Sequence, residues 1–328
     1  MTHARRLAAV ALVAILSLAH AQSLPRVNAG FQAAGTFSWI VHGMKTFGFD
    51  TLNGIDVVGT TYASKQATEL ALRGGEADVT VDDFLGAVLL RSRDVAVTGI
   101  FPYAKAVGGL VVPTGSDITS VADLRGRTIA AGSLRDKSLL ILRALSVSQY
   151  GFDVQEASEV VAASPPLMLQ LVASREVDAA LPFWHFVARI EAAGTGTEIL
   201  SVTDMLEALG LPGDLPNLMV LARDDMPAAH KTAFIAAMME TVETMKSLSN
   251  DDPFWQSILD LGLYTLPNQA QFPAVIDRWR LGTPDAWTEE SIAGLTTMVE
   301  LLVELAGEEV VGIASVPRDS YSTAFNPR

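Results

Sequence analysis

Two adjacent acidic residues, Asp82 and Asp83, are the best candidates in the sequence for acid–base chemistry. Paired carboxylates can divide the roles of general acid and general base between them. Side chains of neighbouring residues diverge in direction, however, and an acidic residue after a strand commonly stabilises the positive end of the next helix. The pair directly follows the apolar stretch "ADVTV" at 77–81. We therefore interpret both residues as capping or ligand-contacting rather than catalytic.

Other signatures of catalysis are incomplete. Gly30 and Gly35 have the spacing of a P-loop, but Thr36 and Phe37 follow where Lys and then Ser or Thr would be needed. The sequence contains neither a G-x-S-x-G nucleophile elbow nor an H-E-x-x-H metal motif. The remaining histidines are scattered, as at His42. We predict that the protein is not an enzyme and holds neither a metal ion nor another cofactor.

Side chains suited to ligand binding follow nearly every predicted strand. They are hydroxyl, amide, charged and aromatic groups, and the adjoining helix N-termini present a positive dipole end that attracts anions. Such a set can bind a ligand without converting it. The predicted ligand-binding residues are Gln32, Thr36, Phe37, Trp39, Tyr62, Ser64, Lys65, Gln66, Asp82, Asp83, Tyr103, Gly132, Ser133, Lys137, Ser164, Phe183, Trp184 and His185.

The elements that must position these residues alternate between strand and helix. Ser64 has the hydroxyl and the place of an N-cap for a helix that Gly74 and Gly75 end. The tail from Met226 onward is predicted to be almost entirely helical. We predict strands at 26–31, 55–60, 77–81, 94–100 and 108–113, and in a second round at 128–132, 157–163, 177–182 and 217–222.

The restart of this pattern predicts two lobes of α/β class. The two rounds do not repeat at a fixed sequence period, so a solenoid is not expected. We predict that the strands at 108–113 and 217–222 carry the chain between the lobes, with lobe one formed by 22–108 and 215–328 and lobe two by 109–214. Trp39 and Trp184 would then lie on loops of opposite lobes and meet when the lobes close.

Length and composition restrict the class of protein. The chain has 328 residues, of which 49% are hydrophobic, enough for two domains with substantial cores. The formal net charge of -14 argues against a nucleic-acid partner, because nucleic acids select basic surfaces. The absence of cysteine excludes disulfides and the lipid-modified cysteine of a lipoprotein.

The first residues have the character of an export signal. Arg5 and Arg6 precede an apolar run from Leu7 to Leu18, and Ala19-His20-Ala21 resembles a cleavage site. The apolar run is short for a membrane-spanning anchor. We predict a signal peptide at 1–21 and a soluble, monomeric protein in the periplasm.

Three segments, in this order, resemble the periplasmic substrate-binding proteins of ABC importers, in the group that binds nitrate, sulfonates, taurine and thiamine precursors. They are "ATELALRGGEADVTVDD" (67–83), "SVADLRGRTIAAGS" (120–133) and "LQLVASREVDAALPFWHF" (169–186). The resemblance covers roughly 24–250. It implies a type II periplasmic-binding-protein fold, in which two αβ lobes joined by a two-strand hinge close on a ligand.

The resemblance also implies a role and partners. The ligand loops of the family correspond to 32–39, 64–66, 82–83, 132–133 and 182–184. The expected function is capture of a small molecule and its delivery to a membrane permease that works with an ATPase subunit. A carboxylate pair at 82–83 departs from the small polar residues of sulfonate binders and disfavours a simple oxyanion. The aromatic residues favour a flat, partly anionic ligand, such as a pyrimidine, a flavin-like ring or a quinone cofactor.

Two alternatives remain open from the sequence. A ligand-presenting sensor domain would have the same binding residues. An enzyme of the same fold, similar to the synthase of a thiamine precursor, would be expected to need a cysteine, which the sequence does not contain.

Overall fold

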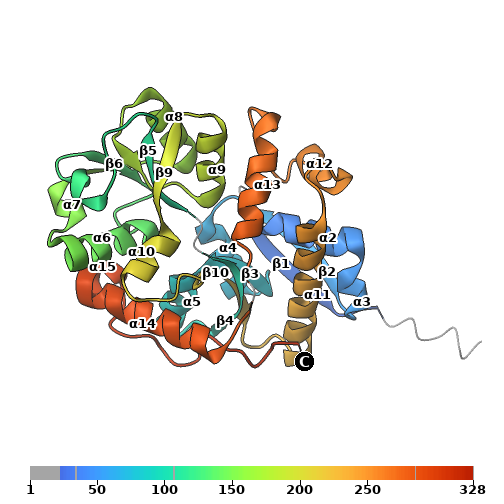
Figure 1. Ribbon diagram of the computed structural model, residues 1–328. Helices are drawn as coiled ribbons and strands as arrows, with labels where there is room; N and C mark the ends of the chain where they lie inside the picture. Colours follow the sequence, from blue (N-terminus) through green and yellow to red (C-terminus); the bar gives the residue numbers. More distant parts are fainter. Residues whose placement is uncertain (1–22, 34, 106–107, 285, 328) are drawn as a thin grey trace, which may run out of the picture.

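The computed structural model describes residues 23–33, 35–105, 108–284 and 286–327, which form two β-sheets covered by helices (Figure 1). The predicted signal peptide at 1–21 lies outside the described residues. Each sheet has five strands, in the orders β2-β1-β3-β10-β4 and β7-β6-β8-β5-β9. The strands of the first sheet are β1 (Arg26–Gln32), β2 (Asp56–Tyr62), β3 (Val79–Asp83), β4 (Val97–Lys105) and β10 (Pro216–Arg223). Those of the second sheet are β5 (Gly109–Pro113), β6 (Thr128–Ala131), β7 (Glu159–Ala162), β8 (Ala179–Ala180) and β9 (Gly196–Ser201).

The two sheets share one arrangement of strand directions. In the first, β1 pairs in parallel with β2 and β3, and β10 is antiparallel to β3 and β4. In the second, β6 pairs in parallel with β7 and β8, and β5 is antiparallel to β8 and β9. This confirms the predicted α/β fold with two lobes. The first lobe contains the first sheet, and the second lobe contains the second sheet.

The chain passes between the lobes at two neighbouring places. One passage follows β4 and leads to β5, and the other follows β9 and leads to β10. Gly109 pairs with Ser201 in the second sheet, and Lys105 pairs with Pro216 in the first. The strands predicted at 108–113 and 217–222 therefore flank the passages, each within one sheet. β9 was not predicted from the sequence. The assignment of 22–108 with 215–328 and of 109–214 to separate lobes stays a proposal, which the strand membership supports.

Helices cover both sheets, and most begin and end at residues with a clear local reason. Ser64 caps α4 as predicted, because its hydroxyl accepts from the Ala67 N–H at 3.2 Å, and Gly75 ends that helix with a φ of 78°. The helices are α2 (Phe37–Phe47), α3 (Phe49–Leu52), α4 (Lys65–Gly74), α5 (Phe84–Arg91), α6 (Lys137–Tyr150), α7 (Val154–Ala157), α8 (Pro165–Ser174), α9 (Trp184–Ala192), α10 (Val202–Ala208), α11 (Ala228–Ser247), α12 (Pro253–Asp260), α13 (Phe272–Leu281), α14 (Glu289–Ala306) and α15 (Glu308–Val311), with 3-10 turns η1 (Val121–Leu124) and η2 (Gln269–Gln271).

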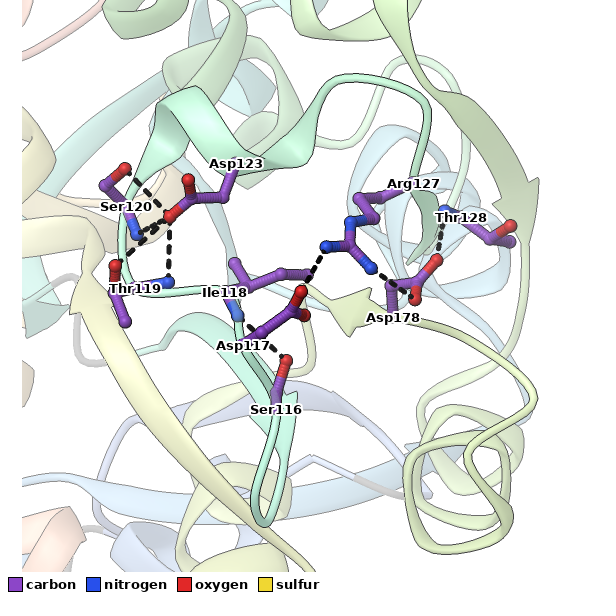
Figure 2. A network of polar contacts seen from close by, with 9 residues as sticks. All are labelled: Ser116, Asp117, Ile118, Thr119, Ser120, Asp123, Arg127, Thr128 and Asp178. Carbon is purple, nitrogen blue, oxygen red and sulfur yellow. Dashed lines mark hydrogen bonds and ion pairs between the residues drawn. The ribbon is translucent and has the colours of Figure 1, made fainter.

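The segment "SVADLRGRT" is part of the frame of the second lobe (Figure 2). The Asp123 carboxylate accepts from the backbone N–H groups of Thr119 and Ser120, both at 3.0 Å, and so closes the turn at the start of η1. Arg127 donates to Asp117 at 2.7 Å and lies 3.6 Å from Asp178, whose carboxylate also accepts from the backbone at the start of β6. This part of the motif therefore fixes the entry to β6 and β8.

The helical tail contacts both lobes (Figure 1). α14 packs against α6 of the second lobe, and α13 packs against α9 of the same lobe. α11 packs on α2 and α3 of the first lobe, and α12 also packs on α2. Pro253 and Pro273 stand in the first turns of α12 and α13, where the missing N–H of proline has no cost. The C-terminal helices thus join elements that are far apart in the sequence.

Candidate functional site

Three charged residues form the Lys65–Asp82–Asp83 cluster at the side of the first sheet where its parallel strands have their carboxyl ends. β2, β1 and β3 run parallel, so the start of α4, which follows β2, and the end of β3 meet at this side. Lys65 Nζ lies 2.6 Å from Asp82 Oδ1 and 2.8 Å from Asp83 Oδ2. The Asp83 N–H donates to Asp82 Oδ1 at 2.7 Å. The acidic pair and the lysine thus form one unit, a pairing that the sequence did not indicate.

The two carboxylates of the cluster differ in electrostatics. Burial raises the pKa of Asp82 to about 7, and the neighbouring charge of Asp83 adds to the increase against the opposing effect of Lys65. Burial also disfavours the charged form of Asp83, but Lys65 and Lys137 outweigh it and hold its pKa below the usual range. The two carboxylates raise the pKa of Lys65 against its own burial. At neutral pH, Lys65 and Asp83 are therefore charged and Asp82 is close to its midpoint.

Asp82 is held inside the protein. Its side chain is 3% exposed, and its Oδ2 atom is buried without a hydrogen-bond partner. Oδ2 points toward α5, where a Cβ atom added at Gly86 would lie only 2.5 Å away. Glycine at this position therefore makes the space that the Asp82 carboxyl group occupies. Asp83 is the more exposed carboxylate of the pair, with 20% of its side chain accessible.

Lys137 of the second lobe acts electrostatically on this cluster. Lys137 is the first residue of α6, and its charge lowers the pKa of Asp83. Its Nζ atom lies 5.7 Å from the centroid of the Phe183 ring. Phe183 is the N-cap residue of α9 and is 45% exposed. Lys137 is thus the residue of the second lobe whose charge acts on the cluster, and Phe183 lies beside Lys137.

The aromatic residues behave differently from the prediction. Trp39 lies within α2, not on a loop, and is 0% exposed. Its ring has edge-to-face contacts at 5.2 Å with Tyr264, 5.7 Å with Phe272 and 6.5 Å with Trp184. The expectation that Trp39 stacks on a ligand is therefore wrong, because other side chains already surround its ring. Trp184 is half-buried and begins α9, so it too lies on a helix.

Further predicted ligand residues belong to the core. Thr36 and Tyr103 are buried and share a hydrogen bond of 2.8 Å between their hydroxyl groups, while Phe37 packs edge to face on Tyr103 at 5.6 Å. His185 is buried beside Tyr264, with its Nδ1 2.9 Å from the phenol oxygen. Burial lowers the pKa of His185 to about 3, so it is neutral. These four residues are satisfied by protein partners and are not open to a ligand in this structure.

The remaining predicted residues lie near the cluster or on exposed loops. Gln32 and Tyr62 are half-buried neighbours at the ends of β1 and β2, and Gln66 is exposed on α4. Gly132 and Ser133 are exposed, but Asp136 caps α6 through the Ser138 N–H at 2.9 Å. Ser164 has the N-cap position of α8 without a capping hydrogen bond from its side chain. At the N-terminus of α6, Asp136 therefore already uses one of the N–H groups that the prediction left for a ligand.

The sequence did not indicate several residues around these sites. Tyr264 and Phe272 lie in the C-terminal segment and enclose Trp39, yet no periodic pattern or motif marks them. Arg278 forms an ion pair with Glu198 across the lobes, and neither residue was singled out. The two residues are 80 positions apart, so no local sequence pattern could have indicated that they pair. Among the described residues no group of side chains is arranged to hold a metal ion.

The chain is similar in sequence and in fold to periplasmic substrate-binding proteins. Residues 50–258 match the family described as "ABC transporter, phosphonate, periplasmic substrate-binding protein". The chain belongs to this family of periplasmic substrate-binding proteins. This confirms the resemblance drawn from the sequence, and it makes the protein a small-molecule-binding component of the ABC-transporter class. No curated protein matches the sequence.

Solved structures of substrate-binding proteins share the fold at low identity. The aliphatic sulphonate-binding protein SsuA from Escherichia coli has a TM-score of 0.70 and 15% identity, with 91% of each chain covered. The alkanesulfonate-binding protein SsuA from Xanthomonas axonopodis, bound to MOPS, has a TM-score of 0.65 and 14% identity, covering 92% of this chain and 99% of that one. The nitrate-binding protein NrtA from Synechocystis has a TM-score of 0.61 and 15% identity, with 92% of each chain covered.

The family implies a periplasmic location and a permease partner. Within the part of the chain that the structure describes, no helix has both the length and the apolar character needed to cross a bilayer.

Proposed function

We propose that this protein captures a small organic ligand between its two lobes and delivers it to the permease and ATPase subunits of an ABC importer. The Lys65–Asp82–Asp83 cluster carries the proposal: Lys65 and Asp83 of the first lobe stay partly exposed, and the charge of Lys137 from the second lobe acts on Asp83. Charged groups that remain partly exposed at a junction of two lobes are typical of binding sites.

We infer a ligand with an acidic group and a flat or apolar part. Lys137 supplies the charge that an acidic group needs, and the exposed Phe183 ring beside it offers a surface for stacking. Asp83 would repel an anion placed directly on it. The ligand is therefore expected to place its acidic group at Lys137 and a neutral or hydrogen-bond-donating group at Asp83.

We propose that the protein is exported to the periplasm before it binds its ligand. Cleavage of the signal peptide after Ala21 would release a soluble, monomeric periplasmic protein without a lipid anchor. N-terminal sequencing of protein from a periplasmic extract should begin at Gln22. Recovery of the intact N-terminus in a membrane fraction would contradict this proposal.

Mass spectrometry of a natively purified sample tests the binding function. The native mass should exceed the mass of the same chain after denaturation by that of a small molecule, and denaturation should release an organic compound with an acidic group. The released compound should bind again to the ligand-free protein. Natively purified protein that carries no ligand, and that binds none from a periplasmic metabolite extract, would overturn the proposal.

A further inference from the structure

The segment from α12 to α13, residues 253–281, contacts elements of both lobes, with α12 beside α2 and α13 beside α9 (Figure 1). We propose that this segment is a clasp that is built onto the first lobe and fastens the second lobe against it. The inference concerns the lobes themselves and does not depend on the identity of a ligand.

The clasp is anchored firmly on the first lobe. Trp255 of α12 is 1% exposed and lies with its ring 6.2 Å from that of Trp39 in α2. Phe272, at the start of α13, contacts Trp39 from another side at 5.7 Å. Ser257 Oγ lies 2.8 Å from His42 Nε2, which also belongs to α2. Because these aromatic rings are buried against α2, the segment is part of the core of the first lobe.

The clasp holds the second lobe through a buried ion pair. Arg278 Nη2 on α13 donates to both carboxylate oxygens of Glu198 in β9, at 2.6 Å and 2.5 Å. The side chains are only 15% and 13% exposed. Glu191 of α9 adds a second carboxylate, 3.5 Å from Arg278 Nη1. Charged hydrogen bonds shielded from water are among the strongest polar contacts in proteins.

Two neutral contacts act beside the ion pair. The Tyr264 hydroxyl group lies 2.9 Å from His185 Nδ1 at the start of α9. The Gln271 side chain donates to the backbone carbonyl of Arg189 at 3.3 Å, further along the same helix. The clasp therefore contacts α9 at both of its ends and β9 beside it. A rotation of the second lobe must break or move several of these contacts together.

Gly109 leaves room for this ion pair. It is the first residue of β5, where the chain enters the second lobe, and a Cβ atom there would lie 2.3 Å from Glu198 Oε1. Any larger residue at this place would push the carboxylate away from Arg278. The absence of a side chain at Gly109, where the chain enters the second lobe, thus allows Glu198 to reach Arg278 of the clasp.

The consequence is that the clasp sets the balance between joined and separated lobes. Hydrogen bonds to charged groups are stronger than neutral ones, so the loss of the Arg278–Glu198 pair should shift that balance toward separation by about tenfold or more. The affinity for any ligand held between the lobes would change with it, although no clasp residue need contact the ligand.

Lobe separation can be measured in the ligand-free protein. The sequence contains no cysteine, so Leu52→Cys in α3 and Glu156→Cys in α7, both exposed, would give unique attachment points for a pair of fluorescent dyes. Single-molecule energy transfer reports the distance between the lobes, and small-angle X-ray scattering reports the overall size. We expect Glu198→Gln and Arg278→Gln to broaden the distance distribution and to increase the radius of gyration. Tyr264→Phe should act in the same direction with a smaller effect.

Arg280→Gln is the matched control. Arg280 also lies on α13, but it donates to Asp277, Asn250 and the Leu248 carbonyl, which belong to the same C-terminal region and not to the second lobe. This substitution should leave the lobe distance unchanged. Unaltered distances and scattering in folded Glu198→Gln and Arg278→Gln proteins would overturn the proposal. If Arg278→Gln does not fold, Glu198→Gln and Tyr264→Phe decide the question by the same measurements. Failure of the clasp would leave the proposed ligand site untouched.

Discussion

Lys65, Asp82, Asp83 and Trp39 were all predicted as ligand-binding residues, but the surroundings of the Lys65–Asp82–Asp83 cluster and of Trp39 differ. In the cluster, Lys65 and Asp83 remain partly exposed, with side chains 34% and 20% accessible. Trp39 has no exposed surface, and its neighbours fill the space around its ring. Polar residues at a sheet edge keep contact with water because burying their charge is costly, whereas aromatic rings gain free energy by burial. Lys65 and Asp83, which stay accessible, are therefore better candidates for ligand contact than the enclosed Trp39.

Removal of the Trp39 side chain should have the largest effect of the tests of this comparison. Trp39→Ala leaves a large cavity among Trp184, Tyr264 and Phe272, and comparable substitutions cost about 3–5 kcal/mol of unfolding free energy. Phe183→Ala, on the exposed side, should cost much less. Urea denaturation of both variants checks this. Equal stability of Trp39→Ala and the wild type would show that the ring is not core.

A methyl group at Gly86 should disturb the cluster from within. The added Cβ would lie 2.5 Å from Asp82 Oδ2, so the carboxyl group or α5 must move, at a cost of about 1–3 kcal/mol. Gly74→Ala in α4 is the control, because a Cβ there meets nothing within 4 Å and alanine is a better helix former. Thermal denaturation should place Gly86→Ala below the wild type and Gly74→Ala at or slightly above it. A Gly86→Ala protein as stable as the control would contradict the placement of Asp82.

The pKa of Asp82 can be tested through the pH dependence of stability. A carboxyl group with a pKa raised to about 7 in the folded state binds more protons folded than unfolded, so its contribution to stability falls as pH rises from about 4 to 7. Asp82→Asn removes this contribution. The difference in unfolding free energy between the variant and the wild type should therefore change in favour of the variant across that range and level off above it.

Buried His185 titrates in an overlapping range with the opposite sign, because its pKa is lowered to about 3. Only the difference between the two proteins, measured by denaturation at a series of pH values, isolates Asp82. A pH-independent difference would show that Asp82 is ionised throughout.

The smallest expected effect is on ligand binding at Lys137. Lys137→Ala should weaken binding of the compound released from native protein by roughly tenfold, the scale of one charge-assisted hydrogen bond. The loss should shrink at high salt, because exposed charges are screened. Arg135→Ala is the control, since Arg135 donates to the Glu309 carbonyl and is exposed. Calorimetric titration that gives equal losses for both variants would remove Lys137 from the site.

Much of the fold was predictable because its signals are local. The apolar runs that became β1, β2 and β6 are bounded by glycine, serine and acidic residues, and Ser64 caps α4 with its own hydroxyl. β9 was missed because "GTEILS" is short and does not alternate between apolar and polar residues. In the structure most of its residues are half-buried. Strand β4 extends to Lys105, beyond the predicted end at 100, since pairing with β10 continues past the apolar stretch.

The sequence by itself determined the two rounds of strand and helix, the charged pair at the end of β3 and the family to which the chain belongs. These depend on residue periodicity, local capping and the order of short motifs. Tertiary structure alone decided that Trp39 is enclosed, that Asp82 is buried while Asp83 stays accessible, and that Arg278 reaches Glu198. The physical reason is that burial and charge pairing are set by neighbours far away in the chain. The residues at 253–281 reach both lobes only after the chain has folded back on itself.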